Sequence, residues 1–319
     1  MKRLAASVAV AADAAQISKK LARALAAATV ASYRKHMLGL AERSPLEAWN
    51  SHINLEQEMK QMGHPGLQRN LRRVIARARG EGLEKDDNFP RLAQSGELKI
   101  MDRKPTIFHL DPSAIDPARL FESYRQVLPP DRVFLLDRYQ LKDLAFKAVG
   151  VGSVGTYCFI GLFASGDAEP LFLQVKEARK SVLEQTGAAP YEGHQGRRVV
   201  EGQRTMQAAT DIFLGWTEDA ASGRQFYIRR LKNQRLRGVS DVAEHEALAD
   251  YACLCGRTLA RAHARSGDPA MIAGYMGKGE AFDDAIASFA TLYAERSIAD
   301  YAVFLKARDA GFGGGLAGR

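Results

Sequence analysis

The most constraining feature of this chain is a glycine loop between two apolar stretches, with Gly150, Gly152 and Gly155 in Gly-x-Gly-x-x-Gly spacing. Glycine has no Cβ, so its backbone adopts positive φ and lets N–H groups come close to a phosphate. We include Ser153, inside the loop, among the predicted cofactor-binding residues. By itself, this spacing is weak evidence for any one function.

The residues that follow the loop distinguish between three known types of phosphate-binding glycine loop. A dinucleotide-binding fingerprint needs a helix there and an acidic residue roughly 20 positions on. This chain continues instead with aromatic and β-branched residues at 157–163, which favour a strand. A Walker loop requires Lys where Thr156 stands. The remaining type is the protein-kinase loop, which joins two strands and is followed one strand later by a phosphate-pairing Lys.

Lys176 lies where the kinase pattern requires its lysine. A turn at 165–167 precedes an alternating apolar strand over 171–178 that carries Lys176. Such a Lys either extends outward along apolar surface or points at an anion. A plain three-stranded antiparallel sheet with bulge glycines and a surface Lys explains the spacing equally well.

The next segment, residues 195–211, has helical periodicity and contains Glu201. In a kinase-like lobe a Glu of this helix holds the strand Lys, and Glu201 has a suitable separation from Lys176. A solvated Glu201 on a surface helix is the other interpretation. Residues 212–216 and 225–231 then predict two further strands, which completes a small nucleotide-binding lobe.

The chain as a whole is predicted to be α+β, with a β-rich segment between two helical ones. We expect a mainly helical segment at 1–130, a β-rich nucleotide-binding-like lobe at 131–236, and a helical segment at 237–319 that packs with the first. Pro129 and Pro130 mark the first boundary. The clearest helical patterns span residues 2–33, as a helix pair, and 46–62, 67–79, 242–263 and 282–307.

The first residues imitate a signal peptide, since Lys2 and Arg3 precede an apolar run. The run is short and rich in Ala, and its helical pattern continues to Tyr33, so we predict packed helices. No apolar segment reaches the roughly 18 residues needed to span a bilayer. Three cysteines without a C-x-x-C pair suggest a reducing compartment, and we expect a cytoplasmic location.

The net charge of +8 could favour nucleotides, nucleic acid, anionic membrane or solubility alone. The densest basic run, Arg69 to Arg79, lacks interleaved aromatic residues, so a solvated helix face is preferred to nucleic-acid binding. The segment from His263 to Asp268 is superficially similar to a kinase His-Arg-Asp loop. It lacks the spacing and the later Asn of that loop.

Longer phrases of the sequence carry a family resemblance. They are KAVGVGSVGT, LFLQVKEA, GRRVVEGQRTMQAATDIFLGW, FYIRRL, ARAHARSGDPAMIAGYMG and FDDAIASFATLYAERSIADY, over most of residues 143–305, together with KRLAASVAVAA from Lys2. These phrases resemble the bacterial family catalogued as domain of unknown function 2252. The sequence departs from the family at Glu295 and Arg296, where members tend to have Asp-Gln.

The resemblance implies a protein-kinase-like fold, similar to small-molecule and aminoglycoside phosphotransferases, in a biochemically uncharacterised family. Members usually carry Gly-Asp-x-His-x-x-Asn-Phe-Gly and Asp-Phe-Asp ahead of the KRLAAS phrase, motifs that resemble a catalytic loop and a magnesium-binding Asp. This sequence begins at that phrase. We therefore expect a permuted lobe order and a catalytically incomplete phosphotransferase, because phosphoryl transfer needs metal-bound charge and an orienting base.

Three hypotheses of function follow. The first is a kinase-like domain in which Gly150, Gly152 and Gly155 cover the phosphates of ATP and Mg²⁺, Lys176 pairs with them, and Glu201 orients Lys176. Its partners would be a nucleotide and an unidentified small-molecule or protein acceptor, with no membrane. The second is a pseudokinase-like binding or interaction protein. The third, and least favoured, is a basic module associated with nucleic acid.

Overall fold

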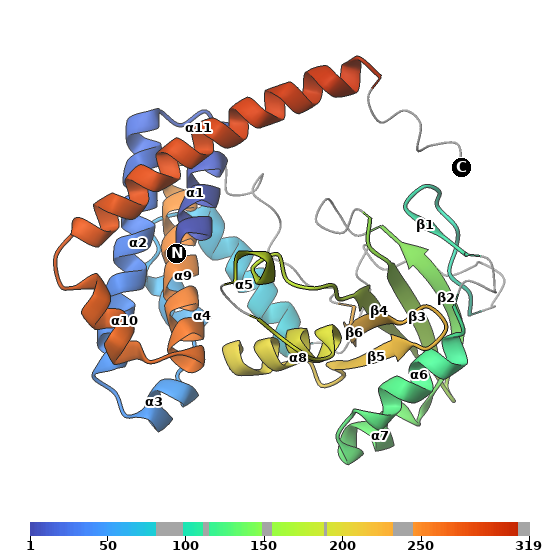
Figure 1. The fold of residues 1–319 in the computed structure, drawn as a ribbon. Helices are drawn as coiled ribbons and strands as arrows, with labels where there is room; N and C mark the ends of the chain where they lie inside the picture. Colours follow the sequence, from blue (N-terminus) through green and yellow to red (C-terminus); the bar gives the residue numbers. More distant parts are fainter. Residues whose placement is uncertain (81–97, 111–114, 149–154, 188–189, 232–244, 312–319) are drawn as a thin grey trace. The chain divides into compact units, whose positions relative to one another are not determined.

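The computed structural model describes residues 1–80, 98–110, 115–148, 155–187, 190–231 and 245–311. It is a mixed α+β structure that divides into two compact units (Figure 1). Unit 1 combines Met1–Gly82 with Arg235–Arg319, and unit 2 is Leu83–Gln234. The ends of the chain thus build one helical unit, and the segment between them builds a β-rich one.

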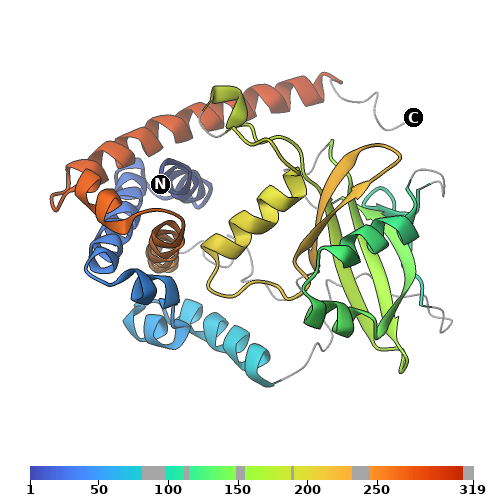
Figure 2. The same ribbon diagram turned by 60° about the horizontal axis from the view of Figure 1, so that its bottom comes forward.

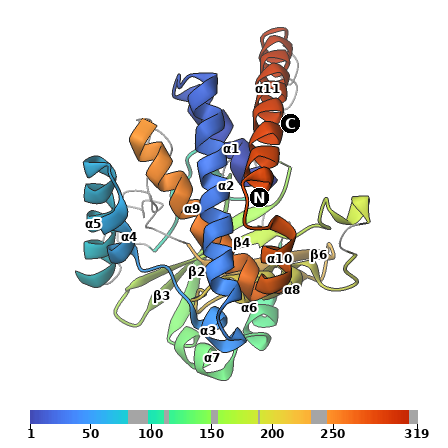
Figure 3. The same ribbon diagram turned by 90° about the vertical axis from the view of Figure 1, so that its left-hand side faces the viewer.

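Unit 1 consists of helices in its described part. They are α1 (Lys2–Ala14), α2 (Lys19–Ala41), α3 (Pro45–Asn50), α4 (Leu55–Gln61), α5 (Pro65–Gly80), α9 (His245–Ser266), α10 (Pro269–Met276) and α11 (Ala281–Asp309). Figure 3 shows α1, α2, α9 and α11 lying side by side, and α2 contacts each of the other three. Within this unit, helices from the first part of the chain pack on helices from the last part.

The helices of unit 1 pack through small side chains. Where α1, α2 and α11 meet, Ala5, Ala26, Ala287 and Ala290 are completely or almost completely buried. Ala has the highest helix propensity and adds little bulk, so an Ala-rich sequence gives stable helices whose backbones approach closely. The helices α1 and α2 are the packed helix pair that the sequence predicted over residues 2–33, and α2 continues to Ala41. Among the described residues, no helix is long and apolar enough to cross a membrane.

One charged contact is buried in this core. The Arg34 guanidinium of α2 donates to both carboxylate oxygens of Asp283 on α11, at 2.7–3.1 Å, and to the Lys278 carbonyl oxygen at 2.8 Å. Both side chains are only 5% exposed. Removing one partner from such a pair leaves a buried, uncompensated charge, so the contact fixes how α11 packs on α2.

Asp283→Ala should therefore destabilise unit 1 by about 3–5 kcal/mol, because Arg34 stays buried without its counter-charge. The neighbouring Asp284→Ala is the matched control. Asp284 is 61% exposed and pairs with Arg23 at the surface, so its loss should cost at most about 1 kcal/mol. Urea unfolding followed by helical circular dichroism measures both changes. Equal effects of the two substitutions would contradict the role given to Asp283.

Unit 2 is built on one antiparallel sheet. Its strands are β1 (Ile107–Phe108), β2 (Tyr139–Lys147), β3 (Cys158–Ser165), β4 (Pro170–Glu177), β5 (Gly215–Asp219) and β6 (Arg224–Arg230), in the order β1-β2-β3-β4-β6-β5. The helical elements are α6 (Pro117–Gln126), α7 (Pro130–Leu136), the short 3₁₀ turn η2 (Glu184–Thr186) and α8 (Gln195–Met206). Figure 2 shows α6 in front of one face of the sheet.

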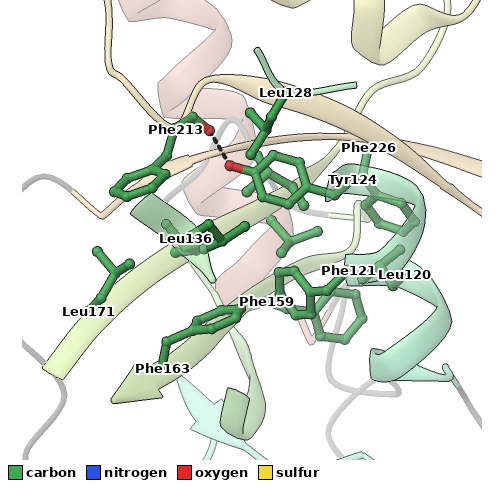
Figure 4. Packing of buried hydrophobic residues seen from close by; sticks show 13 residues of the cluster. Leu120, Phe121, Tyr124, Leu128, Leu136, Phe159, Phe163, Leu171, Phe213 and Phe226 are labelled. Carbon is green, nitrogen blue, oxygen red and sulfur yellow. Dashed lines mark hydrogen bonds between the residues drawn. The ribbon is translucent and has the colours of Figure 1, made fainter. Parts of the chain in front are cut away.

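An aromatic core joins α6 to this face. Tyr124 is fully buried and its hydroxyl donates to the Phe213 carbonyl oxygen at 2.5 Å, while the Phe121 ring meets the Phe163 ring edge-on at 4.9 Å (Figure 4). Burying rings of this size supplies much of the stability of a small sheet. By contact, residues 115–130 therefore group with the sheet, whereas the sequence prediction placed the boundary at Pro129 and Pro130.

The predicted elements of this unit exist with shifted ends. The strand predicted at 171–178 is Pro170–Glu177, and the one predicted at 225–231 is Arg224–Arg230. The helix predicted at 195–211 ends at Met206, and the strand predicted at 212–216 begins later, at Gly215. Asp211 explains the difference, because its carboxylate accepts hydrogen bonds from the backbone N–H groups of Phe213 and Arg230 and so stabilises an irregular connection.

The helix α8 approaches the sheet through a glycine. A Cβ built on Gly196 would lie 2.1 Å from the Phe226 carbonyl oxygen, which is a backbone atom of β6 and cannot turn aside. Gly202, on the same helix, has nothing within 4 Å of an added Cβ. Only the first glycine is therefore required for the packing of α8.

We expect Gly196→Ala to destabilise unit 2 by at least about 1–3 kcal/mol, since α8 must move off β6 to admit the methyl group. Gly202→Ala should instead stabilise by up to about 1 kcal/mol, because Ala is the better helix former. Thermal unfolding of the two variants measures the difference. A Gly196→Ala protein as stable as the Gly202→Ala protein would disprove the close approach.

Candidate functional site

The glycine loop connects two neighbouring strands of the sheet. Strand β2 ends at Lys147 and β3 begins at Cys158, and the two strands are antiparallel partners. Residues 149–154 lie outside the described part of the chain, so Gly150, Gly152 and Ser153 remain predictions. Gly155 is described, and its φ of +76° is a backbone conformation that favours glycine.

Lys176 lies on β4, next to the C-terminal end of the glycine loop. We call this end, residues Gly155 to Tyr157, the stem of the loop. It is paired in register with Cys158 of β3 and with Tyr227 of β6. Neighbouring residues on a strand point to opposite faces, so Phe172, Gln174 and Lys176 share a face, and Leu171, Leu173 and Val175 turn to the aromatic core. The half-buried Lys176 therefore lies on the face away from α6.

Two further cations share that face. Burial raises the pKa of the Cys158 thiol to about 11, and the positive charges of Lys176, Lys147 and Arg229 act against this rise. The Arg229 guanidinium also donates to the side-chain oxygen of Gln174, a fully buried residue of β4, at 3.3–3.4 Å. We call Lys147, Cys158, Gln174, Lys176, Tyr227 and Arg229 the cationic face.

Sequence analysis found only one of these three cations. The signal for Lys147 was present, because it ends the strand before the loop just as Lys176 nearly ends β4. Arg229 could not be selected, since Arg229 and Arg230 are adjacent and only the pairing of β6 with β4 shows which one faces Gln174.

Glu201 lies on α8 as predicted, but on its exposed side. Its carboxylate accepts a hydrogen bond from Arg197 Nε at 2.7 Å, one helical turn earlier. For Glu201 to hold Lys176 it would have to exchange this partner. The pairing of Glu201 with Lys176 therefore stays a prediction.

Glu177, which sequence analysis did not select, holds the stem of the glycine loop. Its carboxylate accepts from the Tyr157 backbone N–H at 2.8 Å and from two nitrogens of Arg179 at 2.9 and 3.1 Å. Arg179 also donates to the Gly155 carbonyl oxygen at 2.6 Å. Desolvation acts to raise the pKa of Glu177, but the hydrogen bonds from Arg179 and Tyr157, together with the positive charges of Arg179 and Arg224, lower this pKa overall. The only sequence signal was an acidic residue directly after Lys176.

The segment similar to a kinase catalytic loop has structural roles in unit 1. The His263 Nδ1 atom is 2.9 Å from the Tyr33 hydroxyl, and burial lowers the pKa of His263. Asp268 caps α10 by accepting from the Ala270 and Met271 N–H groups. Arg265 lies 3.8 Å over the Trp49 ring, and Arg265, Trp49 and Asp268 line a hollow of about 500 Å³.

The donors of the cationic face fit a phosphate and do not by themselves fit Mg²⁺. Lys and Arg side chains pair with phosphate oxygens, whereas Mg²⁺ prefers carboxylate and water oxygens. Within the described ranges, no group of three His, Cys, Asp or Glu residues has the geometry for a metal ion. A nucleotide could bring Mg²⁺ with it, held by its own phosphates.

Family comparison agrees with the sequence phrases. The model of an uncharacterised protein family conserved in bacteria, domain of unknown function 2252, matches residues 1–307. The chain belongs to this family. Comparison with curated proteins and with solved structures gives no significant match.

His109 stabilises the edge of the sheet next to the glycine loop by pairing with two carboxylates. His109, just after β1, lies between the carboxylates of Asp102 (2.7 Å) and Asp143 (3.0 Å). The same β1 segment holds the start of the loop connection, because the Ala148 N–H donates to the Thr106 carbonyl oxygen at 2.8 Å. Desolvation acts to lower the pKa of His109, but hydrogen bonds to Asp143 and Asp102 outweigh it, so this pKa is raised above its usual 6.5.

The stability of unit 2 should depend on pH through His109. A raised pKa means that the folded state binds the proton more tightly, so this stabilisation is complete below about pH 6.5 and is lost as pH rises through the folded pKa. The pKa of Asp102 is lowered, first of all by its hydrogen bond to His109, so its share is present above about pH 4 and is lost below. The window of full stabilisation therefore lies between these limits.

Thermal unfolding from pH 4 to pH 9 measures this dependence. His109→Gln should abolish the loss of stability above pH 6.5, while the exposed His52→Gln, in unit 1, should leave it unchanged. Identical pH profiles of the wild type and His109→Gln would contradict the stabilising role of the His109 pairs with Asp102 and Asp143.

Proposed function

We propose that unit 2 binds the phosphate groups of a nucleotide, with ATP as the leading candidate, on the cationic face beside the glycine loop. The observation that carries this proposal is the gathering of Lys147, Lys176 and Arg229 around Cys158, from three different strands. Lys and Arg side chains pair with phosphate oxygens, so three cations on one partly buried face offer a polyphosphate several charged donors at once.

The loop adds the second component of a phosphate site. Backbone N–H groups of a glycine-rich turn bind phosphate oxygens, and Gly155 already has positive φ. Lys176 is one strand beyond the loop, in the place of the phosphate-pairing lysine of protein kinases. On these grounds we propose a kinase-like fold and an ATP-dependent phosphotransferase domain, with Gly150, Gly152, Ser153 and Gly155 over the phosphates.

Under this proposal the residues of the chain have separate roles. Lys147, Lys176 and Arg229 bind and orient the polyphosphate, and Mg²⁺ would enter with the nucleotide to neutralise the charge that develops on the transferred group. Glu201 would orient Lys176 once its carboxylate has given up the hydrogen bond from Arg197. The acceptor would be a small molecule or a protein. We also propose a cytoplasmic location, which rests on the cysteine count.

A second candidate is a binding or interaction protein that holds a nucleotide without transferring phosphate. It is favoured by the structural roles of His263 and Asp268, since the segment most similar to a catalytic loop serves the packing and capping of helices. Measuring transfer of the γ-phosphate to water or to candidate acceptors separates the two candidates.

Calorimetry with Mg²⁺ and ATP tests the binding step. Lys176→Ala should weaken binding about tenfold or more, or some 1.4 kcal/mol, because a phosphate loses its cation. Lys142→Ala is the matched control, since Lys142 is an exposed lysine of β2 that donates to Gln140. Tripolyphosphate should compete with ATP. A folded chain that binds neither compound would overturn the proposal.

A further inference from the structure

We propose that the hollow of about 500 Å³ in unit 1 binds a small aromatic carboxylate, a molecule that combines one ring with one carboxylate group. The hollow is lined by residues of the segment 41–49, which runs from the end of α2 into α3, and of the segment 264–270, which runs from the end of α9 into α10. All of these residues belong to unit 1. The inference therefore goes beyond the proposed function and does not depend on the cationic face of unit 2.

The size and the walls of this hollow suit a small ligand. Cavities that bind small molecules usually enclose about 300–1,000 Å³ and combine apolar walls with a few polar groups. The walls here are small apolar residues, namely Ala41, Pro45, Ala48, Ala264 and Pro269. Ala and Pro side chains have almost no rotamer freedom to lose, so packing a ligand against them costs little entropy.

Trp49 and Arg265 provide an oriented aromatic contact on the lining. The Arg265 guanidinium lies 3.8 Å from the centre of the Trp49 ring and donates to the Trp49 carbonyl oxygen. A guanidinium over an indole is a stabilising arrangement, and it orients both groups before a ligand arrives. Trp49 is 45% exposed, so a ligand ring can pack on the accessible part of the indole.

The charged residues of the lining favour a carboxylate. They are Arg43, Arg265 and Asp268. The Asp268 Oδ1 atom accepts from the Ala270 and Met271 N–H groups at 2.8 and 3.1 Å, so this carboxylate caps α10. The positive groups of the lining are the two guanidinium groups, whose planar donors match the two oxygens of a carboxylate.

More positive charge lies behind Arg265. Arg257, Arg261 and Arg265 follow one another at intervals of four on α9, so they share one side of the helix. Arg261 is only 7% exposed, and its pKa is lowered by burial first and then by the charge of Arg265. Burial also lowers the pKa of His36 on α2, and the charges of Arg257 and Arg261 add to this effect, while Glu58 opposes it. One carboxylate among three guanidinium groups leaves this region positive, which favours an anionic ligand.

The lining is complementary to a molecule that carries both a ring and a charge. A phosphate or acetate ion would pair with the arginines but would leave the Trp49 ring and the apolar walls in water. A neutral aromatic molecule would cover the walls but would displace water from the guanidinium groups without replacing its hydrogen bonds. An aromatic carboxylate therefore uses the whole lining.

The fluorescence of Trp49 provides a direct test. Trp49 and Trp216 are the two tryptophans of the chain, and Trp216 lies on β5 of unit 2, so the full chain with Trp216→Phe reports on Trp49 alone. This protein is titrated with benzoate, benzamide and acetate. Benzamide keeps the ring without the charge, and acetate keeps the charge without the ring. We expect saturable binding of benzoate, at least about fivefold tighter than that of either other compound.

Three further substitutions in that background locate the site. Arg43→Gln removes an exposed cation, and Arg265→Lys keeps the charge but loses the guanidinium fork. Each should weaken benzoate binding about five- to tenfold. Arg296→Gln is the matched control, because Arg296 is a 77% exposed arginine of α11 that pairs with Asp300. It should change benzoate affinity less than about twofold.

A titration with benzoate that gives no saturable change of Trp49 fluorescence, or equal affinities for benzoate and benzamide, would overturn the proposal. Equal effects of Arg43→Gln and Arg296→Gln would also overturn it, provided that helical circular dichroism shows both proteins folded. Lys176→Ala should leave benzoate binding unchanged. If it weakens benzoate as much as Arg43→Gln does, the anion binds to unit 2 and the hollow is not its site.

The two proposals fail separately. A folded chain that binds benzoate but no ATP or tripolyphosphate would remove the nucleotide site and leave the hollow of unit 1 as a binding site. A chain that binds ATP but not benzoate would do the reverse.

Discussion

The two faces of the β3–β4 pair are occupied differently, and the rest of unit 2 depends on this constraint. Every residue from Cys158 to Ala164 is buried, so neither face of β3 is left to solvent. One face packs on the rings of α6, and the other carries an apolar patch with Ile160 and Phe172 beside the cationic face. Because side chains alternate along a strand, the aromatic core fixes which residues turn toward the cations.

This arrangement connects packing with function. Tyr124, held at the Phe213 carbonyl, anchors α6 on one side, and the register that results places Lys176 opposite Cys158 and Tyr227 on the other. A one-residue slip of β4 would exchange Lys176 for Glu177, which would reverse the charge next to Cys158. The same slip would remove the carboxylate from the loop stem. Cation placement and loop attachment therefore depend on a single register.

Local signals in the sequence predicted much of the fold but not its interruptions. The region 46–62 was predicted as one helix, yet it forms α3 and α4, because Asn54 accepts from the N–H groups of Glu56 and Gln57 and starts a new helix. The predicted 195–211 helix likewise ends early, at Met206, where Gln207 is extended, and Asp211 then binds backbone groups of the connection to β5. Asn and Asp occur both within helices and as caps or turn residues, so their presence in the sequence does not reveal which of these roles they have.

By itself the sequence determined the α+β class, the family, the strand–loop–strand order and the place of Lys176 on β4, since these follow from periodicity, glycine spacing and local phrases. Only the tertiary structure decided which residues accompany Lys176. Lys147 and Arg229 come from strands separated by about eighty positions, and Glu201 turned toward Arg197. Pairing between distant strands depends on packing across the whole sheet, and no local pattern contains that information.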